Sequence, residues 1–97
     1  MTKLLRLRKE EIKTIKTLIT QNLGECEIYI FGSRTDLNKK GGDVDIYIIP
    51  KNRVKFEQKL RLATELEDAL LRPVDLIISS NPNRPIEIEA KKGVKIL

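Results

Sequence analysis

A long amphipathic segment between two short β-branched runs is the feature of this sequence that most constrains its fold. Residues 54–71 are predicted to form a helix, because apolar residues recur on one face and Arg72-Pro73 ends the pattern. The apolar residues of that face are Phe56, Leu60, Ala63, Leu66 and Leu70. The flanking runs, 43–49 and 74–78, predict strands. Two strands joined by a long helix are expected to be parallel and adjacent.

The rest of the chain supplies the other elements of a small sheet. Residues 8–22 place their apolar residues at helical spacing, and Gly24 lies near the end of that predicted helix. The run 27–31 predicts a strand. Only about ten residues separate it from the next strand, too few for a crossover helix, so these two strands are expected to be antiparallel. A short helix over 86–92 and a last strand over 94–97 complete the chain.

These elements predict a single domain over residues 1–97, with no internal repeat and no linker. The predicted fold class is α/β (α+β), a small mixed β-sheet with helices packed on it. Four apolar residues near the C-terminus are expected in the core, although an interface would also explain them. They are Ile86, Ile88, Val94 and Ile96.

The absence of histidine limits the chemistry that the chain can perform. It excludes serine–histidine and cysteine–histidine catalysis and histidine-rich zinc sites. Chemistry must therefore rest on carboxylates, hydroxyls, lysines and arginines. The single cysteine, Cys26, has no partner for an internal disulfide and is expected to be a small packing residue at a strand edge. A reducing, cytoplasmic location is the simplest expectation.

Charge and hydropathy narrow the range of partners. No apolar run approaches the roughly 18 residues of a spanning helix, and residues 1–8 lack the apolar core of a signal peptide, so no membrane partner is expected. The net charge of +5 favours anionic partners such as nucleotides, nucleic acid or an acidic protein. A solvated, lysine-rich surface explains this charge equally well.

Asp43 and Asp45 are the first candidates for a metal site. Side chains two apart on a strand point to the same face, so these carboxylates are expected side by side, with Val44 and Ile46 anchoring the opposite face in the core. A hard divalent cation such as Mg²⁺ relieves the repulsion between the two carboxylates. The motif alone is weak, since two solvated aspartates on a half-exposed strand would explain it as well.

Asp75 strengthens the case, because it interrupts an apolar run, 74–78, that otherwise predicts a buried strand. A buried aspartate is costly unless it is paired or bound to metal. If the strands are neighbours, Asp75 lies beside Asp43 and Asp45, and three carboxylates can hold two Mg²⁺ ions. The alternative is an edge-strand aspartate paired with a lysine or arginine.

The segment Gly32-Ser33-Arg34 follows the first strand and is a candidate phosphate site. Glycine permits close approach of a phosphate to the backbone, and a serine hydroxyl with free backbone N–H groups can hold phosphate oxygens. Arg34 is suited to bind phosphate bidentately, or lies simply at the surface. Ser33 and Asp36 also have the spacing of a capping box, which is compatible with either role.

In combination these segments resemble the DNA polymerase β-like nucleotidyltransferase superfamily. The pattern is Phe31-Gly32-Ser33-Arg34, then Asp43-Val44-Asp45-Ile46, then an acidic residue on the next strand. Within the superfamily the chain looks like the minimal nucleotidyltransferases (MNT) of HEPN/MNT toxin–antitoxin pairs, over nearly its whole length. The resemblance implies that Gly32 and Ser33 hold the terminal phosphates of a nucleotide and that Asp43 and Asp45 ligate both Mg²⁺ ions. Asp75 matches the third carboxylate, which ligates the catalytic metal and helps to activate the acceptor hydroxyl.

The resemblance also implies a reaction and a partner. The reaction is Mg²⁺-dependent transfer of AMP from ATP to a tyrosine of a HEPN toxin, with release of pyrophosphate, which makes this chain the antitoxin. Two departures concern the phosphate loop: Gly42 stands where many relatives have serine before the first aspartate, and Thr35-Asp36-Leu37 replaces an arginine-glycine pattern.

Other functions stay open at the sequence level. The chain would serve as a non-catalytic binding module if it neutralised a HEPN partner by complex formation alone, and transfer to a nucleic acid or a small molecule is a third, weaker option. The absence of tryptophan and the presence of only four tyrosine and phenylalanine residues argue against a base-stacking nucleic-acid surface. Hetero- and homo-oligomers are both compatible with the sequence.

Overall fold

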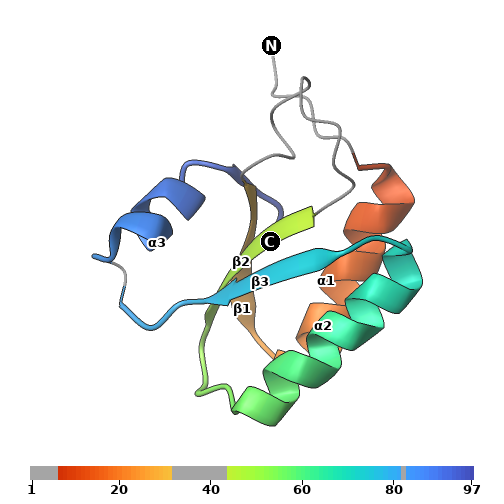
Figure 1. Ribbon diagram of the computed structural model, residues 1–97, viewed down its shortest axis with the longest axis horizontal. Coiled ribbons are helices and arrows are strands. Elements are labelled where there is room, and N and C mark those ends of the chain that lie inside the picture. The colour runs from red at the N-terminus through yellow and green to blue at the C-terminus, as the bar shows by residue number, and fades with distance from the viewer. Residues whose placement is uncertain (1–6, 32–43, 82) are drawn as a thin grey trace.

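The computed structural model describes residues 7–31, 44–81 and 83–97, which form a mixed sheet with three helices (Figure 1). The phosphate segment Gly32-Ser33-Arg34 and Asp43 lie outside the described residues. In chain order the elements are α1 (Lys9–Leu23), β1 (Cys26–Phe31), β2 (Val44–Pro50), α2 (Phe56–Leu70), β3 (Val74–Ile78), α3 (Pro85–Ala90) and β4 (Val94–Lys95). Within these ranges no helix is long and apolar enough to cross a membrane.

The sheet has the strand order β3-β2-β1-β4. Strands β2 and β3, joined by α2, are parallel, whereas β1 is antiparallel to both β2 and β4. The parallel and antiparallel pairings predicted from the connection lengths are therefore confirmed. Strand β4 is shorter than predicted, but the ladder continues beyond it: Ile96 N–H donates to the Ile28 carbonyl at 2.8 Å, and Ile28 N–H donates to the Leu97 carbonyl at 3.0 Å.

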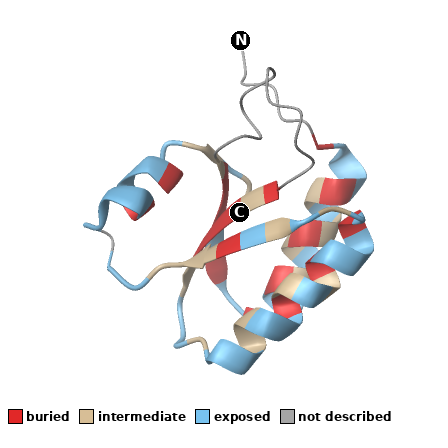
Figure 2. Cartoon of the chain, viewed as in Figure 1, coloured by how far each residue is buried: buried red, intermediate tan, exposed pale blue. Residues whose placement is uncertain are grey.

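The two faces of the sheet are covered differently (Figure 2). Helices α1 and α2 pack on one face, where Val44 and Ile46, the two neighbours of Asp45 in the sequence, are fully buried as expected. Ile15 and Ile19 of α1 and Leu62 and Leu66 of α2 complete this core, and all four are fully buried. Helix α3 covers part of the opposite face, where Tyr29, Tyr47 and Ala90 form a second, smaller cluster. The sheet therefore has one wholly apolar face and one mixed face.

The expected buried face of α2 was partly wrong. Phe56 is 69% exposed and Leu60 is 51% exposed. Leu66 and Leu70 are buried as predicted, and Leu62 continues their stripe in place of Leu60, because residues at i, i+4 and i+8 form one continuous ridge. Two large apolar side chains at the start of α2 are thereby left in solvent.

The expectation that Ile86 and Ile88 belong to the core was also wrong. Their side chains are 50% and 47% exposed. Helix α3 has only six residues and buries Glu87 and Ala90 instead, so its inward face carries a carboxylate rather than isoleucines. Ile96, in contrast, packs against the main core as expected.

Candidate functional site

Asp45 and Asp75 are direct register partners on the parallel strands β2 and β3. Each is the second residue of its strand. Side chains of register partners project from the same face of a sheet, and neighbouring strands lie only about 4.8 Å apart. The two carboxylates therefore stand in one row on the face opposite to α1 and α2. The sequence-based expectation that Asp75 stands beside the aspartate motif of β2 is met for Asp45.

The register position shared by Asp45 and Asp75 continues onto a third strand, β1. Phe31, the last residue of β1, is the register partner of Asp45 on its other side. The end of β1 and the starts of β2 and β3 thus meet at one edge of the sheet. Since Gly32 follows Phe31 in the sequence and Asp43 precedes Val44, the segments proposed to bind phosphate and metal connect directly to this row. Their own roles stay predictions.

The surroundings of Asp75 differ from the sequence-based expectation. Strand β3 is an edge strand and Asp75 is exposed, so burial imposes no cost on this carboxylate. The edge-strand position agrees with part of the alternative drawn from the sequence, but the pairing with a lysine or arginine that went with it is not among the salt bridges of the described residues, and the metal-ligand role stays a prediction. Among the described residues, none of the salt bridges includes Asp75. The Asp75 oxygens are therefore accessible to a ligand, while Asp45, next to it, is half-buried.

The start of β3 is fixed by contacts with both helices of the main core. Glu67 on α2 accepts a 2.9 Å hydrogen bond from Val74 N–H, and Val44 N–H donates to the Pro73 carbonyl at 3.0 Å. The buried carboxylate of Glu11 on α1 lies 3.2 Å from the guanidinium of Arg72. The strand end that carries Asp75 is thus held to β2, α1 and α2, which makes the carboxylate row rigid.

These residues fit a site for a hard divalent cation. Two carboxylates on one face supply the oxygen ligands that Mg²⁺ prefers, and one of them is open to solvent. In the described part of the chain there is no group of three or more histidine, cysteine, aspartate or glutamate side chains able to hold a metal. The described residues therefore bring together two of the three predicted ligands, and Asp43 is the third.

A buried carboxylate, Glu87, joins α3 to the same face of the sheet. Its side chain is fully buried and accepts a 2.8 Å hydrogen bond from the Tyr47 hydroxyl and a 2.7 Å bond from the Ser79 hydroxyl. The N–H groups of Ser80 and Asn81 donate to its other oxygen, each at 3.0 Å. Arg84 completes the cluster through a 3.1 Å contact of its Nε.

The pKa values of this cluster follow from its contacts. Burial raises the pKa of Glu87, but the hydrogen bonds donated by Asn81, Ser79, Ser80 and Tyr47 outweigh burial and lower the pKa to about 2. Burial raises the pKa of Tyr47, so its hydroxyl stays protonated and keeps donating. The centre of the cluster is therefore an ionised carboxylate that accepts hydrogen bonds from five donor groups.

Sequence reasoning missed Glu87, although one signal was present. Glu87 is the third residue of a helix that begins with Pro85, a position at which glutamate commonly accepts hydrogen bonds from backbone N–H groups of the preceding turn.

Cys26 is buried at the start of β1, and burial raises the pKa of its thiol. The interpretation of Cys26 as a packing residue is thereby confirmed.

Comparison with known proteins identifies similar folds. The sequence profile described as "Polymerase beta, Nucleotidyltransferase" matches residues 10–97. No match was found among curated proteins. The crystal structure of the toxin–antitoxin MntA-HepT superposes with a TM-score of 0.71 at 21% identity, over 93% of this chain and 72% of that chain.

Two further structures carry a nucleotide or its product. A tri-AMPylated Shewanella oneidensis HEPN toxin in complex with MNT antitoxin matches with a TM-score of 0.73 at 22% identity, over 94% of this chain and 72% of that chain. A toxin–antitoxin structure with AMP-PNP matches with a TM-score of 0.73 at 23% identity, over 89% of this chain and 72% of that chain. At these identities the similarity establishes the fold, and it confirms the fold class predicted from the sequence.

Proposed function

Because this chain belongs to the polymerase beta nucleotidyltransferase family, we propose that it transfers AMP from ATP to a tyrosine of a HEPN toxin and so acts as an antitoxin. The observation that carries the proposal is the register pairing of Asp45 with Asp75 at the edge of the sheet where β1 ends. That arrangement brings two carboxylates to the end of the sheet at which β1 ends, and Gly32, the first residue of the segment proposed to bind phosphate, follows β1 in the sequence.

The proposal assigns a role to each residue of the site. Asp43, Asp45 and Asp75 are the proposed ligands of two Mg²⁺ ions, and Gly32, Ser33 and Arg34 are the proposed contacts of the nucleotide phosphates. Bound Mg²⁺ would neutralise the charge of the phosphates and of the attacking oxygen. The exposed position of Asp75 supports its role, because an acceptor on another protein must be able to reach it.

The proposed reaction is an in-line displacement at the α-phosphorus of ATP. The tyrosine oxygen forms a new bond to phosphorus, Asp75 takes the phenolic proton, and the bond from the α-phosphorus to the bridging oxygen breaks. Pyrophosphate leaves with that pair of electrons. The rigid row that holds Asp45 and Asp75 serves the positioning on which phosphoryl-type transfer depends.

The partner is proposed from the structural neighbours. These neighbours are toxin–antitoxin complexes, and one of them is an AMPylated HEPN toxin bound to its MNT antitoxin. The similarity spans most of this chain, including the strands that carry Asp45 and Asp75.

Labelled ATP provides the direct test. The chain is incubated with α-labelled ATP, Mg²⁺ and a candidate HEPN partner protein, with an active relative and its own toxin in parallel. The proposal expects label on the HEPN protein, lost when its candidate tyrosine is replaced by phenylalanine. Absence of label in this reaction, while the relative labels its toxin, contradicts the proposed activity.

The alternative is a binding module that neutralises the toxin without catalysis. The double variant Asp45→Asn and Asp75→Asn separates the two functions, because it removes negative charge and leaves the core unchanged. Neutralisation of toxin growth arrest by this variant at wild-type level would favour the binding module. Loss of neutralisation with retained complex formation would favour the enzyme.

A further inference from the structure

The segment 51–61 is strongly basic. It contains five basic residues and one acidic residue, Glu57. Lys51, Arg53 and Lys55 are all exposed in the connection between β2 and α2. Lys51 lies 3.5 Å from Glu25, whereas among the described residues Arg53 and Lys55 take part in no salt bridge. Two cations are thus available to an external partner.

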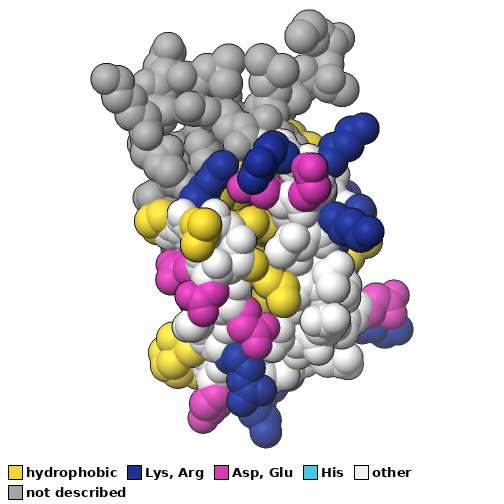
Figure 3. Space-filling model, turned by 90° about the vertical axis from the view of Figure 1, so that its right-hand side faces the viewer, with side chains coloured by type: hydrophobic (Ala, Val, Ile, Leu, Met, Phe, Trp, Pro, Cys, Tyr) yellow, Lys and Arg dark blue, Asp and Glu magenta, His cyan; other side chains and the backbone are white. Residues whose placement is uncertain are grey.

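Two large apolar side chains lie beside these cations. Phe56 and Leu60 are 69% and 51% exposed, and their spacing of four residues places them on the same side of α2. Figure 3 shows exposed apolar side chains next to basic ones at the lower end of the helical side of the molecule. We call this set of four residues, Arg53, Lys55, Phe56 and Leu60, the basic–apolar surface.

The basic–apolar surface is also hollowed. A cavity of about 500 Å³ is lined by Lys51, Arg53, Ser79 and Ser80 among others, and a second of about 460 Å³ is lined by residues 53–57. Arg53 and Val54 line both, so the loop between β2 and α2 forms a ridge between two recesses. A partner can therefore place side chains on either side of this ridge.

We infer that the basic–apolar surface is a docking site for the acceptor protein, which would present acidic side chains around an apolar recess that accepts Phe56. The inference rests on the proposed function, since it assumes that the acceptor is a protein. An exposed aromatic centre with a charged rim is the usual composition of a protein–protein interface, and arginine is enriched there. A nucleic-acid surface would instead need a row of cations with several stacking aromatics, and this surface has one aromatic residue.

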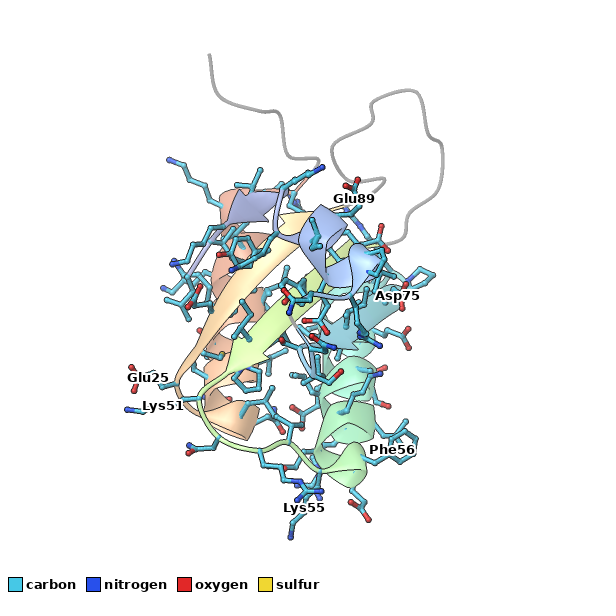
Figure 4. All side chains as sticks on the ribbon, turned by 90° about the vertical axis from the view of Figure 1, so that its left-hand side faces the viewer. Glu25, Lys51, Lys55, Phe56, Asp75 and Glu89 are labelled. Atoms are coloured by element: carbon cyan, nitrogen blue, oxygen red, sulfur yellow. The ribbon has the colours of Figure 1, made fainter. Side chains whose placement is uncertain are left out.

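The docking site lies away from the carboxylate row. Figure 4 places Lys51, Lys55 and Phe56 at one end of the molecule and Asp75 nearer the other. Lys51 follows the last residue of β2, and Asp45 is the second residue of that strand, so about 20 Å of extended chain separates them. Docking would hold the body of the acceptor protein while a separate segment carries its tyrosine to Asp45 and Asp75. Such contacts act on substrate binding more than on the chemical step.

Binding measured without nucleotide tests the inference. The chain and the HEPN protein that it labels or is proposed to label are titrated by calorimetry in the absence of ATP. The double variants Phe56→Ser with Leu60→Ser, and Arg53→Glu with Lys55→Glu, are each expected to raise Kd by about tenfold or more. Circular dichroism checks that every variant is folded, which is expected because all four side chains are exposed.

Matched controls make the result specific. Leu71→Ser removes an 87% exposed leucine at the other end of the same helix, and Lys13→Glu reverses an exposed charge on α1. Both are expected to leave Kd within about twofold of wild type. Wild-type affinity in the two double variants, equal losses in the controls, or no binding of the HEPN protein by the wild-type chain would each overturn the docking site.

Two further measurements distinguish the docking site from the catalytic site and from a nucleic-acid surface. Asp45→Asn is expected to bind the HEPN protein with wild-type Kd. Absence of AMP transfer by the wild-type chain, together with binding that depends on Phe56, would reject the proposed activity and keep the docking site. A labelled single-stranded RNA is titrated in parallel by fluorescence anisotropy. RNA binding that the Arg53→Glu with Lys55→Glu variant abolishes, with unchanged affinity for the HEPN protein, would assign the surface to nucleic acid and overturn the inference.

Discussion

The Tyr47 hydroxyl donates a 2.8 Å hydrogen bond to the fully buried carboxylate of Glu87, forty residues further along the chain. Tyr47 follows Asp45 by two residues on β2, so its side chain projects from the same face of the sheet. Its ring lies 5.8 Å from that of Tyr29 on β1, centroid to centroid. The bond therefore anchors α3 on the face that carries Asp45 and Asp75.

Replacing Glu87 by glutamine is expected to destabilise the fold strongly. The amide nitrogen of glutamine is a hydrogen-bond donor, and it would face the N–H and O–H groups that donate to the carboxylate of Glu87. At least one of these buried groups would therefore lose its acceptor. We expect the free energy of unfolding in urea to fall by about 3 kcal/mol. Glu89→Gln is the control, since Glu89 is exposed and pairs with Lys92 at the surface. A similar loss in both variants would contradict the role of Glu87.

Stability is expected to fall at acidic pH because of the same carboxylate. The pKa of Glu87 is about 2 in the folded chain, against an ordinary value of 4.5, so the unfolded chain binds this proton more tightly. Its contribution is complete above about pH 4.5 and is lost as pH falls toward 2. Urea unfolding of wild type and Glu87→Gln at a series of pH values checks this prediction. The difference between them should shrink over that window, and a constant difference would contradict the assignment.

The parallel pairing of Asp45 with Asp75 was predictable, whereas their environment was not. A helix between two β-branched runs determines that the strands are parallel, and the position of each aspartate near the start of its run gives the register. The exposure of Asp75 depends on β4, which pairs with β1 and so leaves β3 as an edge. Two residues of β4 carry too weak a pattern to reveal that order.

The sequence analysis did not predict the cluster around Glu87, for a related reason. A helix of six residues is too short to show a periodic apolar face, so its two isoleucines were expected in the core, whereas the structure exposes them.

The exposure of Phe56 and Leu60 has a different cause. A helix with apolar residues on more than one side can pack through either, and the contact with the sheet decides in favour of Leu62 and Leu66.

Any side chain at position 93 is expected to destabilise the fold, because Gly93 packs closely against β1. A Cβ atom at this position would meet the backbone carbonyl of Ile30, and would lie only 2.8 Å from Cβ of Phe31. Because the obstructing atoms belong to a central strand, Gly93→Ala should lower the free energy of unfolding by about 2 kcal/mol. Gly24 offers a contrast: open space surrounds it, but its φ of 78° with a ψ of −148° is a backbone conformation that is accessible mainly to glycine. Gly24→Ala should cost about 1 kcal/mol, and a greater loss there than at Gly93 would contradict the clash.

Removing a carboxylate from the site is expected to reduce activity, and for the exposed Asp75 to do so without reducing stability. Asp45→Asn and Asp75→Asn should each lower the rate of AMP transfer by at least about a hundredfold, because each removes a proposed ligand of the Mg²⁺ ions that would balance the charge of the phosphates in the transition state. Arg34→Ala should cost far less, since one phosphate contact is only part of the positioning.

Stability and a control variant separate this effect from unfolding. Asp75 is exposed on an edge strand, so Asp75→Asn should change the free energy of unfolding by no more than about 0.5 kcal/mol. Asp68→Asn is the control, since Asp68 is an exposed aspartate on α2, on the other side of the sheet. Asp68→Asn should keep both activity and stability. Full activity in Asp75→Asn would show that the row of carboxylates on β2 and β3 is not the catalytic site, whatever the fold shares with active relatives.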